Sequence, residues 1–294
     1  MTVEGARPTS PFRSLNVTEI DDDALADAYN LGLDLEKAGD IEGAEREYRK
    51  VLALDPSDPA GVGIRLAALG RVPTPEKMPD AYVATLFDQH ADVFDDILVE
   101  QLGYCVPLLL REKIRQLGLG PFESLLDLGC GTGLTGVAFA DCADQLTGVD
   151  LSEKIVEHAF DREVYDDLYV GEAVAFLQEF EEDDGTVPSY SFIAATDVFP
   201  YLGDAGAMVS GAAARLNPNG YFAFSTESLT ASGEAGPSFV VGAKKRFAHR
   251  LDYLEQLLRT HGFKTLVADP ITVRLEDGEP VPGHLVIAQL SAAA

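Results

Sequence analysis

The chain has 294 residues, 46% of them hydrophobic and 24% charged, which is typical of a soluble globular protein. Its 49 acidic residues outnumber 22 basic ones, and the resulting net charge of −27 repels nucleic-acid phosphates. We therefore expect neither DNA nor RNA as a substrate.

The apolar runs and the cysteines further limit the class of protein to which the chain can belong. The sequence contains no apolar run of about 18 residues, the length that a membrane span requires, and its first residues lack the apolar core of a secretory signal. The three cysteines, Cys105, Cys130 and Cys142, have no zinc-like spacing. We expect a cytoplasmic protein with no membrane partner and no bound metal.

The N-terminal part of the chain divides into an arm and a helical segment. Residues 1–22 are polar and interrupted by prolines, and they are predicted to form a flexible arm. Residues 23–72 show two amphipathic helices, separated at Ala38–Asp40 and ended by Asp55–Pro59. Small and large packing residues recur along both helices, at Ala28, Leu31, Gly32, Leu35, Ala44, Tyr48, Val51 and Pro56. This pattern resembles one complete tetratricopeptide (TPR) repeat.

A single repeat cannot bury its own apolar faces, because such arrays need about three units. Two interpretations of residues 23–72 follow. The segment either shields one face of the next domain or docks a protein partner, which includes a second copy of this chain. Residues 73–119 are predicted to be a helical connection, with helices near 80–98 and 106–117.

Residues 124–136 carry the most informative pattern of the chain. A short apolar run reaches Asp127 and then breaks into alternating glycines over 129–133 before a helix. A strand, a glycine turn and a helix bring bare backbone against a nucleoside-bearing cofactor, because glycine leaves room for close approach. The next strand ends in Asp150, which suits ribose hydroxyls, and then Leu151, an apolar wall for adenine.

Two classes of cofactor fit this loop. Residues 131–136 satisfy the G-x-G-x-x-G pattern, and Asp150 follows Gly131 by 19 residues, near the spacing of a dinucleotide site. Residues 119–151, however, contain five acids and no Lys or Arg. A pyrophosphate is stabilised by positive charge and a cationic cofactor by acids, so the charges favour the cationic cofactor.

The remaining segments predict the fold. From residue 120 onward strand-like and helix-like segments alternate, which is typical of a doubly wound parallel sheet. The last two strands, about 264–275 and 284–290, are joined at Asp277–Gly278 without a helix. We predict an α/β fold for residues 120–294, with a Rossmann-like seven-stranded sheet and an antiparallel terminal strand. A dinucleotide-binding domain lacks this hairpin.

The stretch Asp127-Leu-Gly-Cys-Gly-Thr-Gly133 closely resembles motif I of the class I S-adenosylmethionine (SAM)-dependent methyltransferases. Residues 86–92, 197–203 and 246–249 resemble the same class. With the repeat-like segment in front, the chain is similar to bacterial predicted methyltransferases that carry an N-terminal TPR. The resemblance implies SAM as cofactor and direct in-line methyl transfer from its sulfonium to an unidentified small-molecule or protein side-chain acceptor.

The resemblance, together with the strand ends, implies a set of site residues. The residues expected to contact the cofactor are Asp127, Gly129, Cys130, Gly131, Gly133, Asp150, Leu151, Glu172, Ala173, Asp197, Phe199 and Phe87. Glu172 stands where many members of the class have Asp, which receives the adenine amino group.

Further residues are expected to contact the acceptor. Phe87 and Tyr82 lie in a helix similar to the one that small-molecule methyltransferases place over the cofactor, and Tyr82 is a candidate for substrate binding. Asp197, Phe199 and Tyr201 are expected nearest the reacting atoms, with Tyr201 as a catalytic candidate.

The segment 227–249 is long and lies where this class inserts substrate-recognition elements. Its cluster Lys244–Arg246 is the densest basic group of the chain, and Arg246 suits a substrate carboxylate because its guanidinium offers two parallel donors. His249 suits a general base, since its unperturbed pKa is about 6.5. The other interpretation is that these cations cap a solvent-exposed helix.

Two further classes of function stay open. A catalytically silent protein with this fold would act as an adaptor through residues 23–72. An NAD-dependent oxidoreductase would use the glycine loop for a dinucleotide.

Overall fold

The computed structural model describes residues 21–229 and 236–291, so nearly all of the arm predicted over 1–22 lies outside the described residues. The chain divides into two compact units, Met1–Pro56 and Ser57–Ala294. The helix α3 (Val62–Ala68), which falls within the predicted segment 23–72, therefore groups with the larger unit.

The smaller unit contains α1 (Asp22–Ala38) and α2 (Ile41–Leu54). Each helix begins at an aspartate whose carboxylate accepts a backbone N–H, from Ala24 to Asp21 at 3.0 Å and from Gly43 to Asp40 at 2.9 Å. Gly39 ends α1 with a φ of 80°, which glycine adopts without strain. The predicted pair of helices is confirmed, and its assignment as a TPR stays a prediction.

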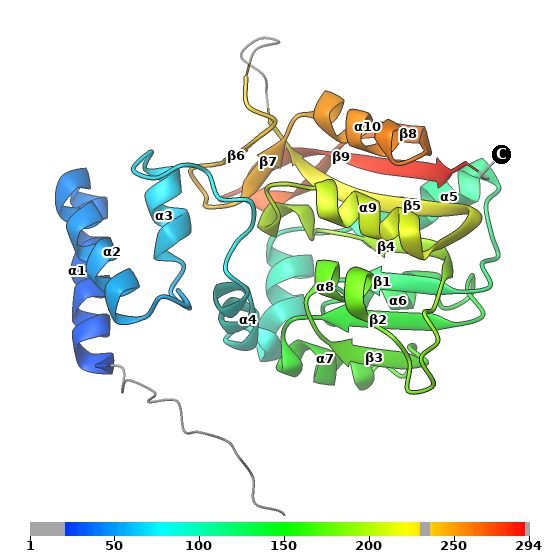
Figure 1. Cartoon of the computed structure of the whole chain (residues 1–294), viewed down its shortest axis with the longest axis horizontal. Coiled ribbons are helices and arrows are strands. Elements are labelled where there is room, and N and C mark those ends of the chain that lie inside the picture. The colour runs from blue at the N-terminus through cyan, green and yellow to red at the C-terminus, as the bar shows by residue number, and fades with distance from the viewer. Residues whose placement is uncertain (1–20, 230–235, 292–294) are drawn as a thin grey trace, which may run out of the picture. The chain divides into compact units, whose positions relative to one another are not determined.

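The larger unit is built on one sheet (Figure 1). Five strands are parallel in the order β3-β2-β1-β4-β5, and β9 and then β8 add antiparallel strands beside β5. The bounds are β1 Leu125–Leu128, β2 Leu146–Asp150, β3 Asp167–Val170, β4 Tyr190–Ala195, β5 Leu216–Ser228, β8 Phe263–Glu276 and β9 Glu279–Leu290. The hairpin turn falls at Asp277–Gly278, with φ of 53° and 82°, so the predicted antiparallel terminal strand is confirmed.

In the part of the chain that the structure describes the sheet has nine strands, so the prediction of seven is wrong. The two additional strands are β6 (Phe239–Val241) and β7 (Phe247–His249), which lie in the predicted insert. The cause is the length of β5, whose pairing with β4 ends at Phe224 while the strand continues to Ser228. Its last two residues then pair with β7.

Helices cover both faces of the sheet (Figure 1). Neighbouring residues of β1 point to opposite faces, so Leu126 packs with residues of α8, α9 and α10, and Leu125 with residues of α5 and α6. The helices on the two faces are α5 Val106–Leu117, α6 Leu134–Phe139, α7 Glu153–Phe160, α8 Ala173–Glu179, α9 Gly206–Arg215 and α10 Leu251–Thr260. Within 21–229 and 236–291, no helix has the length and apolar character that crossing a membrane requires.

A short helical segment precedes α5 in the sequence. It consists of α4 (Asp80–Asp88), a 3₁₀ turn at Ala91–Val93 and a π-helical turn at Asp96–Gln101. We call residues 80–101 the lid segment, because several of its side chains line the pocket described next.

Candidate functional site

A pocket opens at the carboxyl ends of β1 to β4, where ligands bind in doubly wound sheets. It contains about 960 Å³ of space, counting the part that is open to solvent. One part of its wall, the loop half, consists of Gly129–Thr132, Asp150, Leu151, Glu172 and Ala173. The other part, the aromatic half, consists of Phe87, Phe94, Tyr104, Asp197 and Tyr201.

The glycine loop after β1 forms the floor of the loop half. Gly129 and Gly131 have φ of 64° and 54°, which places both in the left-handed region. A Cβ on Gly129 would lie 2.6 Å from a methyl group of Val198, so the loop also needs glycine for space. The pocket is therefore lined there by backbone, as the sequence predicts.

Asp150 fastens this loop to the end of β2. Its Oδ2 accepts the Gly131 N–H at 3.0 Å, and its Oδ1 accepts the Ser152 N–H at 3.0 Å. Burial raises the pKa of Asp150, although these backbone hydrogen bonds oppose the rise. Each carboxylate oxygen keeps a lone pair for a ligand hydroxyl, because a carboxylate offers about four acceptor sites.

Leu151, Glu172 and Ala173 complete the loop half. Glu172 also begins α8, since its Oε2 accepts the Ala175 N–H at 2.7 Å. One of its two carboxylate oxygens is therefore already used as a helix cap.

The lid segment contributes aromatic side chains and is tied to the loops by acids. The Phe87 ring lies 5.4 Å from that of Tyr201 and 5.5 Å from that of Phe94, measured between centroids. Asp88 accepts from Ser152 Oγ, after β2, and Asp95 accepts from Thr132 Oγ1 in the glycine loop.

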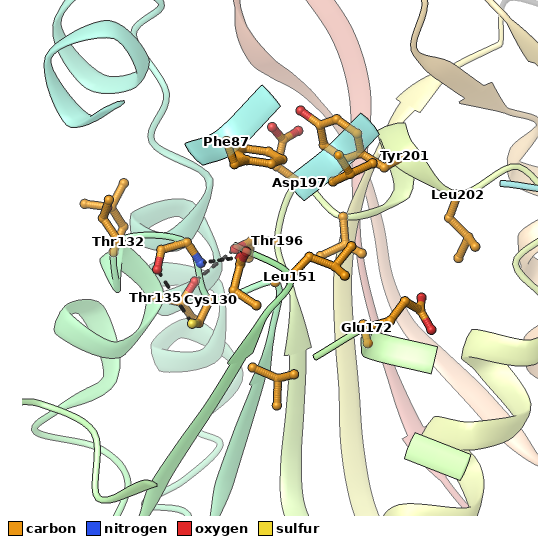
Figure 2. A pocket seen from close by; sticks show the side chains of 18 of the residues that line it. Phe87, Cys130, Thr132, Thr135, Leu151, Glu172, Thr196, Asp197, Tyr201 and Leu202 are labelled. Carbon is orange, nitrogen blue, oxygen red and sulfur yellow. Dashed lines mark hydrogen bonds between the residues drawn. The ribbon is translucent and has the colours of Figure 1, made fainter. Parts of the chain in front are cut away.

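Asp197 is the acid of the aromatic half. It follows β4 with a φ of 60°, and its N–H donates to Ser225 Oγ at 2.8 Å. Its buried Oδ1 has no hydrogen-bond partner among the described residues and lies 3.7 Å from Arg274. Burial raises the pKa of Asp197, while the charges of Arg246 and Arg274 oppose the rise. Figure 2 shows Phe87, Asp197 and Tyr201 on one side of the pocket, with Cys130, Thr135 and Thr196 apart from them.

Arg246 lies behind this wall and does not line the pocket. Its guanidinium donates to the Tyr201 hydroxyl at 2.7 Å and lies 5.2 Å from the centre of that ring. It faces a second hollow instead, together with Lys244, Glu227 and Glu276. Arg274, 2% exposed, donates to Glu227 at 2.6 Å, so the aromatic half is backed by a network of paired charges.

His249 cannot serve as the predicted general base. It is fully buried outside the pocket, and both ring nitrogens are hydrogen-bonded at 2.9 Å, Nδ1 with Thr226 Oγ1 and Nε2 with the Gly203 carbonyl. A carbonyl only accepts, so Nε2 carries the proton and Nδ1 accepts from Thr226. Burial lowers the pKa of His249 to about 4.

Four other predicted contact residues do not line the pocket. Asp127 is fully buried beneath the glycine loop, and Phe199 is buried and stacked on Phe224 at 4.3 Å. Gly133 begins α6, and Tyr82 packs against Gly61. The other predicted cofactor residues, Gly129, Cys130, Gly131, Asp150, Leu151, Glu172, Ala173, Asp197 and Phe87, all line it, as does Tyr201.

Several lining residues were not anticipated. Tyr104, 6% exposed, enters the pocket just before α5, and Thr135 and Thr196 join across it through their hydroxyls at 2.9 Å. Tyr104 precedes a helix, Thr135 lies in the first turn of one and Thr196 follows a strand, and this is their only sequence signal. No motif spacing selects them.

Comparison with known proteins agrees with this geometry. Residues 103–268 match the family model described as a methyltransferase domain. Over 119 residues the chain is 26% identical to the ubiquinone biosynthesis O-methyltransferase of Hydrogenovibrio crunogenus, covering 39% of this chain and 47% of that protein. Over 48 residues it is 40% identical to the 18S rRNA (guanine-N(7))-methyltransferase of Bos taurus, covering 16% and 17%. The chain thus spans less than half the length of either relative.

Solved structures show the same fold. A SAM-dependent methyltransferase from Clostridium acetobutylicum superimposes with a TM-score of 0.50 at 15% identity, over 70% of this chain and all of that one. The DhpI–SAH complex superimposes with a TM-score of 0.50 at 14% identity, over 72% of this chain and 97% of that one. The family match covers more than half of the chain, so the chain belongs to the methyltransferase-domain family and has the fold of the class I SAM-dependent enzymes.

Proposed function

We propose that this chain binds SAM in the pocket and transfers its methyl group to a small, uncharged acceptor. The observation that carries the proposal is the position of Asp150, which lies in the pocket wall and is hydrogen-bonded to the glycine loop. An acid at the end of the second strand suits the ribose hydroxyls of a nucleoside cofactor.

The charges of the wall support SAM over a dinucleotide. The acids lining the pocket are Asp80, Asp150, Glu172 and Asp197, and the one lining cation among the described residues, Lys77, is paired with Asp80 at 2.8 Å. Such a wall stabilises a sulfonium and an ammonium and repels a pyrophosphate. The N–H of Gly131, which a phosphate would need, already donates to Asp150.

The residues of the loop half are those that would hold SAM. Gly129–Gly131 would support its methionine part, Asp150 its ribose, and Leu151 with Glu172 its adenine. SAM supplies a methyl group already activated on a sulfonium. The chain's part is then to orient the acceptor, exclude water and accept a proton.

The aromatic half supports an uncharged acceptor that carries a hydroxyl or an N–H. Phe87, Phe94 and Tyr104 offer apolar surface, and the carboxylate of Asp197, which lines the same part of the wall, would accept the proton. An acceptor carboxylate in this part of the pocket would meet Asp197 before Arg246, so the lining does not favour the carboxylate-bearing acceptor predicted from Arg246. One curated relative is by name an O-methyltransferase, which agrees with a hydroxyl acceptor.

Calorimetric titration with S-adenosylhomocysteine (SAH), with NADH in parallel, tests cofactor binding. We expect SAH to bind in the micromolar range, NADH not to bind, and Asp150→Ala to weaken SAH by tenfold or more. Asp166→Ala is the matched control, because Asp166 also accepts a backbone N–H, from Leu146 at 2.8 Å, at the other end of β2. Absence of SAH binding would contradict the proposal and favour the adaptor, and NADH binding would favour the oxidoreductase.

Methyl transfer from labelled SAM to substituted phenols, anilines and benzoates tests the acceptor class. We expect the phenols or anilines to be methylated and Asp197→Asn to lower the rate without changing the Kd of SAH. Asn is a suitable replacement because it tolerates the left-handed backbone of Asp197. Preference for the benzoates would restore the carboxylate prediction.

A further inference from the structure

Tyr165 lies in the turn between α7 and β3 and packs against the back of the glycine loop. Its ring occupies the space that side chains on three glycines would fill. A Cβ on Gly136 would lie 2.5 Å from this ring, and a Cβ on Gly133 or Gly148 would lie 3.1 Å from it. Gly136, the last glycine of the dinucleotide-like pattern, is therefore required by Tyr165 and does not line the pocket.

The Tyr165 hydroxyl joins the two ends of the loop. It donates to Asp127 Oδ2 at 2.6 Å, at the end of β1, and accepts the Gly136 N–H at 3.1 Å, in α6. Asp127 is fully buried, and its other oxygen has no hydrogen-bond partner among the described residues. The Tyr165 hydroxyl thus donates to a buried carboxylate, and losing a hydrogen bond to such a group is costly.

A second residue of the same turn contacts the middle of the loop. Arg162 donates to the Thr132 carbonyl and forms an ion pair with Asp95 of the lid segment. Thr132 lines the pocket on its other side. The turn therefore supports the loop at its start, middle and end.

We propose that Tyr165 is a positioning residue that holds the glycine loop in its cofactor-binding shape and couples cofactor affinity to the protonation of Asp127. The inference rests on the proposed function, because it takes SAM and SAH as the ligands of the loop. Tyr165 acts through Asp127 and the loop, and it does not line the pocket.

The direction of the coupling follows from the groups around Asp127. Asp150, Cys130, Tyr104 and Tyr165 face it from β2, the loop, the segment before α5 and the turn. Burial raises the pKa of Asp127 to about 7 and the charge of Asp150 acts in the same direction, while the hydroxyls of Tyr165 and Thr135 lower it. A ligand ammonium near these acids favours the ionised form, so affinity is present above pH 7 and falls below it.

The test is the Kd of SAH for the full chain between pH 5.5 and 9, in the wild type and the variants Tyr165→Phe, Asp127→Asn and Tyr253→Phe. Tyr253 is a matched control because its hydroxyl also donates to an acid, Asp204 at 2.8 Å, and accepts an N–H, from Ala205 at 3.0 Å, outside the pocket. The titration of SAH itself is the same for all variants.

We expect Tyr165→Phe to weaken SAH about tenfold or more at pH 7 and to move the pH midpoint of affinity upward, because the hydrogen bond that lowers the pKa of Asp127 is removed. Asp127→Asn should bind SAH with a flattened pH dependence, since Asn cannot ionise and its carbonyl still accepts from Tyr165. Tyr253→Phe should stay within twofold of the wild type. A residual pH dependence in Asp127→Asn equal to that of the wild type would assign the titration to Asp150 and overturn the coupling.

Tyr165→Phe that binds SAH like Tyr253→Phe at every pH would overturn the positioning role while leaving the proposed function intact. If Tyr165→Phe does not fold, Asp127→Asn alone decides the coupling. A wild-type chain that fails to bind SAH at any pH would overturn both proposals.

Discussion

The two halves of the pocket are built from different kinds of sequence. The loop half is made by residues that directly follow β1, β2 and β3, and its hydrogen bonds run largely to backbone N–H groups. The aromatic half combines the lid segment, Tyr104 and the end of β4. Behind it lie side chains from β5 and β8 and Arg246, which directly precedes β7. The residues of the loop half are placed by the strands that they follow, although Tyr165 and Arg162 support the loop from behind. The aromatic half depends on pairs of side chains from segments far apart in the sequence.

The largest expected effect comes from a substitution that disrupts the aromatic half. Arg274→Met should remove the cation that pairs with Glu227 and faces Asp197, and it should leave these two largely buried carboxylates without that cation. Removing one partner from a buried ion network costs about 3–5 kcal/mol, so we expect a loss of that order in the free energy of unfolding. Denaturant unfolding measures it.

Lys113→Met is the control for Arg274, because its ion pair with Asp269 at 2.7 Å is at the surface and is expected to contribute at most about 1 kcal/mol. Equal losses for the two variants would show that the charges behind the aromatic half are not coupled.

The next largest effect is expected from a substitution in the loop half. Gly129→Ala should weaken SAH about 100-fold, because the residue has a φ of 64° and its Cβ would lie 2.6 Å from Val198. The double variant Gly129→Ala, Val198→Ala relieves the contact but not the backbone strain, so it should recover only part of the affinity. Calorimetry with SAH distinguishes the two causes, and full recovery would show that backbone conformation contributes nothing.

The difference between the loop half and the aromatic half also explains which site residues the sequence predicts. The strand ends, the glycine loop and Asp150 follow from local pattern, because β1 and β2 fix where the next residues lie. Arg274 and Tyr165 were missed because their partners, Glu227 and Asp127, are 47 and 38 residues away and no spacing links them.

The incorrect predictions have the same origin. The interpretation of His249 as a base rested on its intrinsic pKa, and no pattern showed that Thr226 and Gly203 would enclose it. The alternation of segments predicted the parallel sheet, but β6 and β7 are three residues each, too short to show a period.

An effect of intermediate magnitude is expected from the protonation of His249. Its pKa falls to about 4 in the folded chain, so the unfolded chain binds its proton first as the pH drops. The stability that this neutral histidine contributes is fully present above about pH 6.5 and is lost as the pH falls toward 4. The loss amounts to about 2 kcal/mol at pH 5.

Denaturant unfolding of the wild type and of His249→Gln at pH 7.5 and 5 measures this contribution of His249. The difference in stability between the two chains should shrink by about 2 kcal/mol at pH 5, since glutamine does not titrate. Asp127, Asp150 and Asp197 have raised pKa values and act in the opposite direction, so only the comparison between chains isolates His249. A difference that does not change with pH would show that His249 titrates normally and is accessible.

The smallest expected effect concerns the contact between the halves. Asp95 joins the lid segment to Thr132 and Arg162, but its side chain is 40% exposed, so its ion pair is partly screened by solvent. Asp95→Ala should weaken SAH only about three- to tenfold and raise its dissociation rate, because the lid is held less firmly over the pocket. Asp92→Ala is the matched control, since Asp92 lies in the same segment, is 98% exposed and contacts only His158 at 3.4 Å among the ion pairs described. Stopped-flow displacement of SAH gives both rates, and a loss confined to the association rate would mean that Asp95 shapes the entrance and does not hold the lid closed.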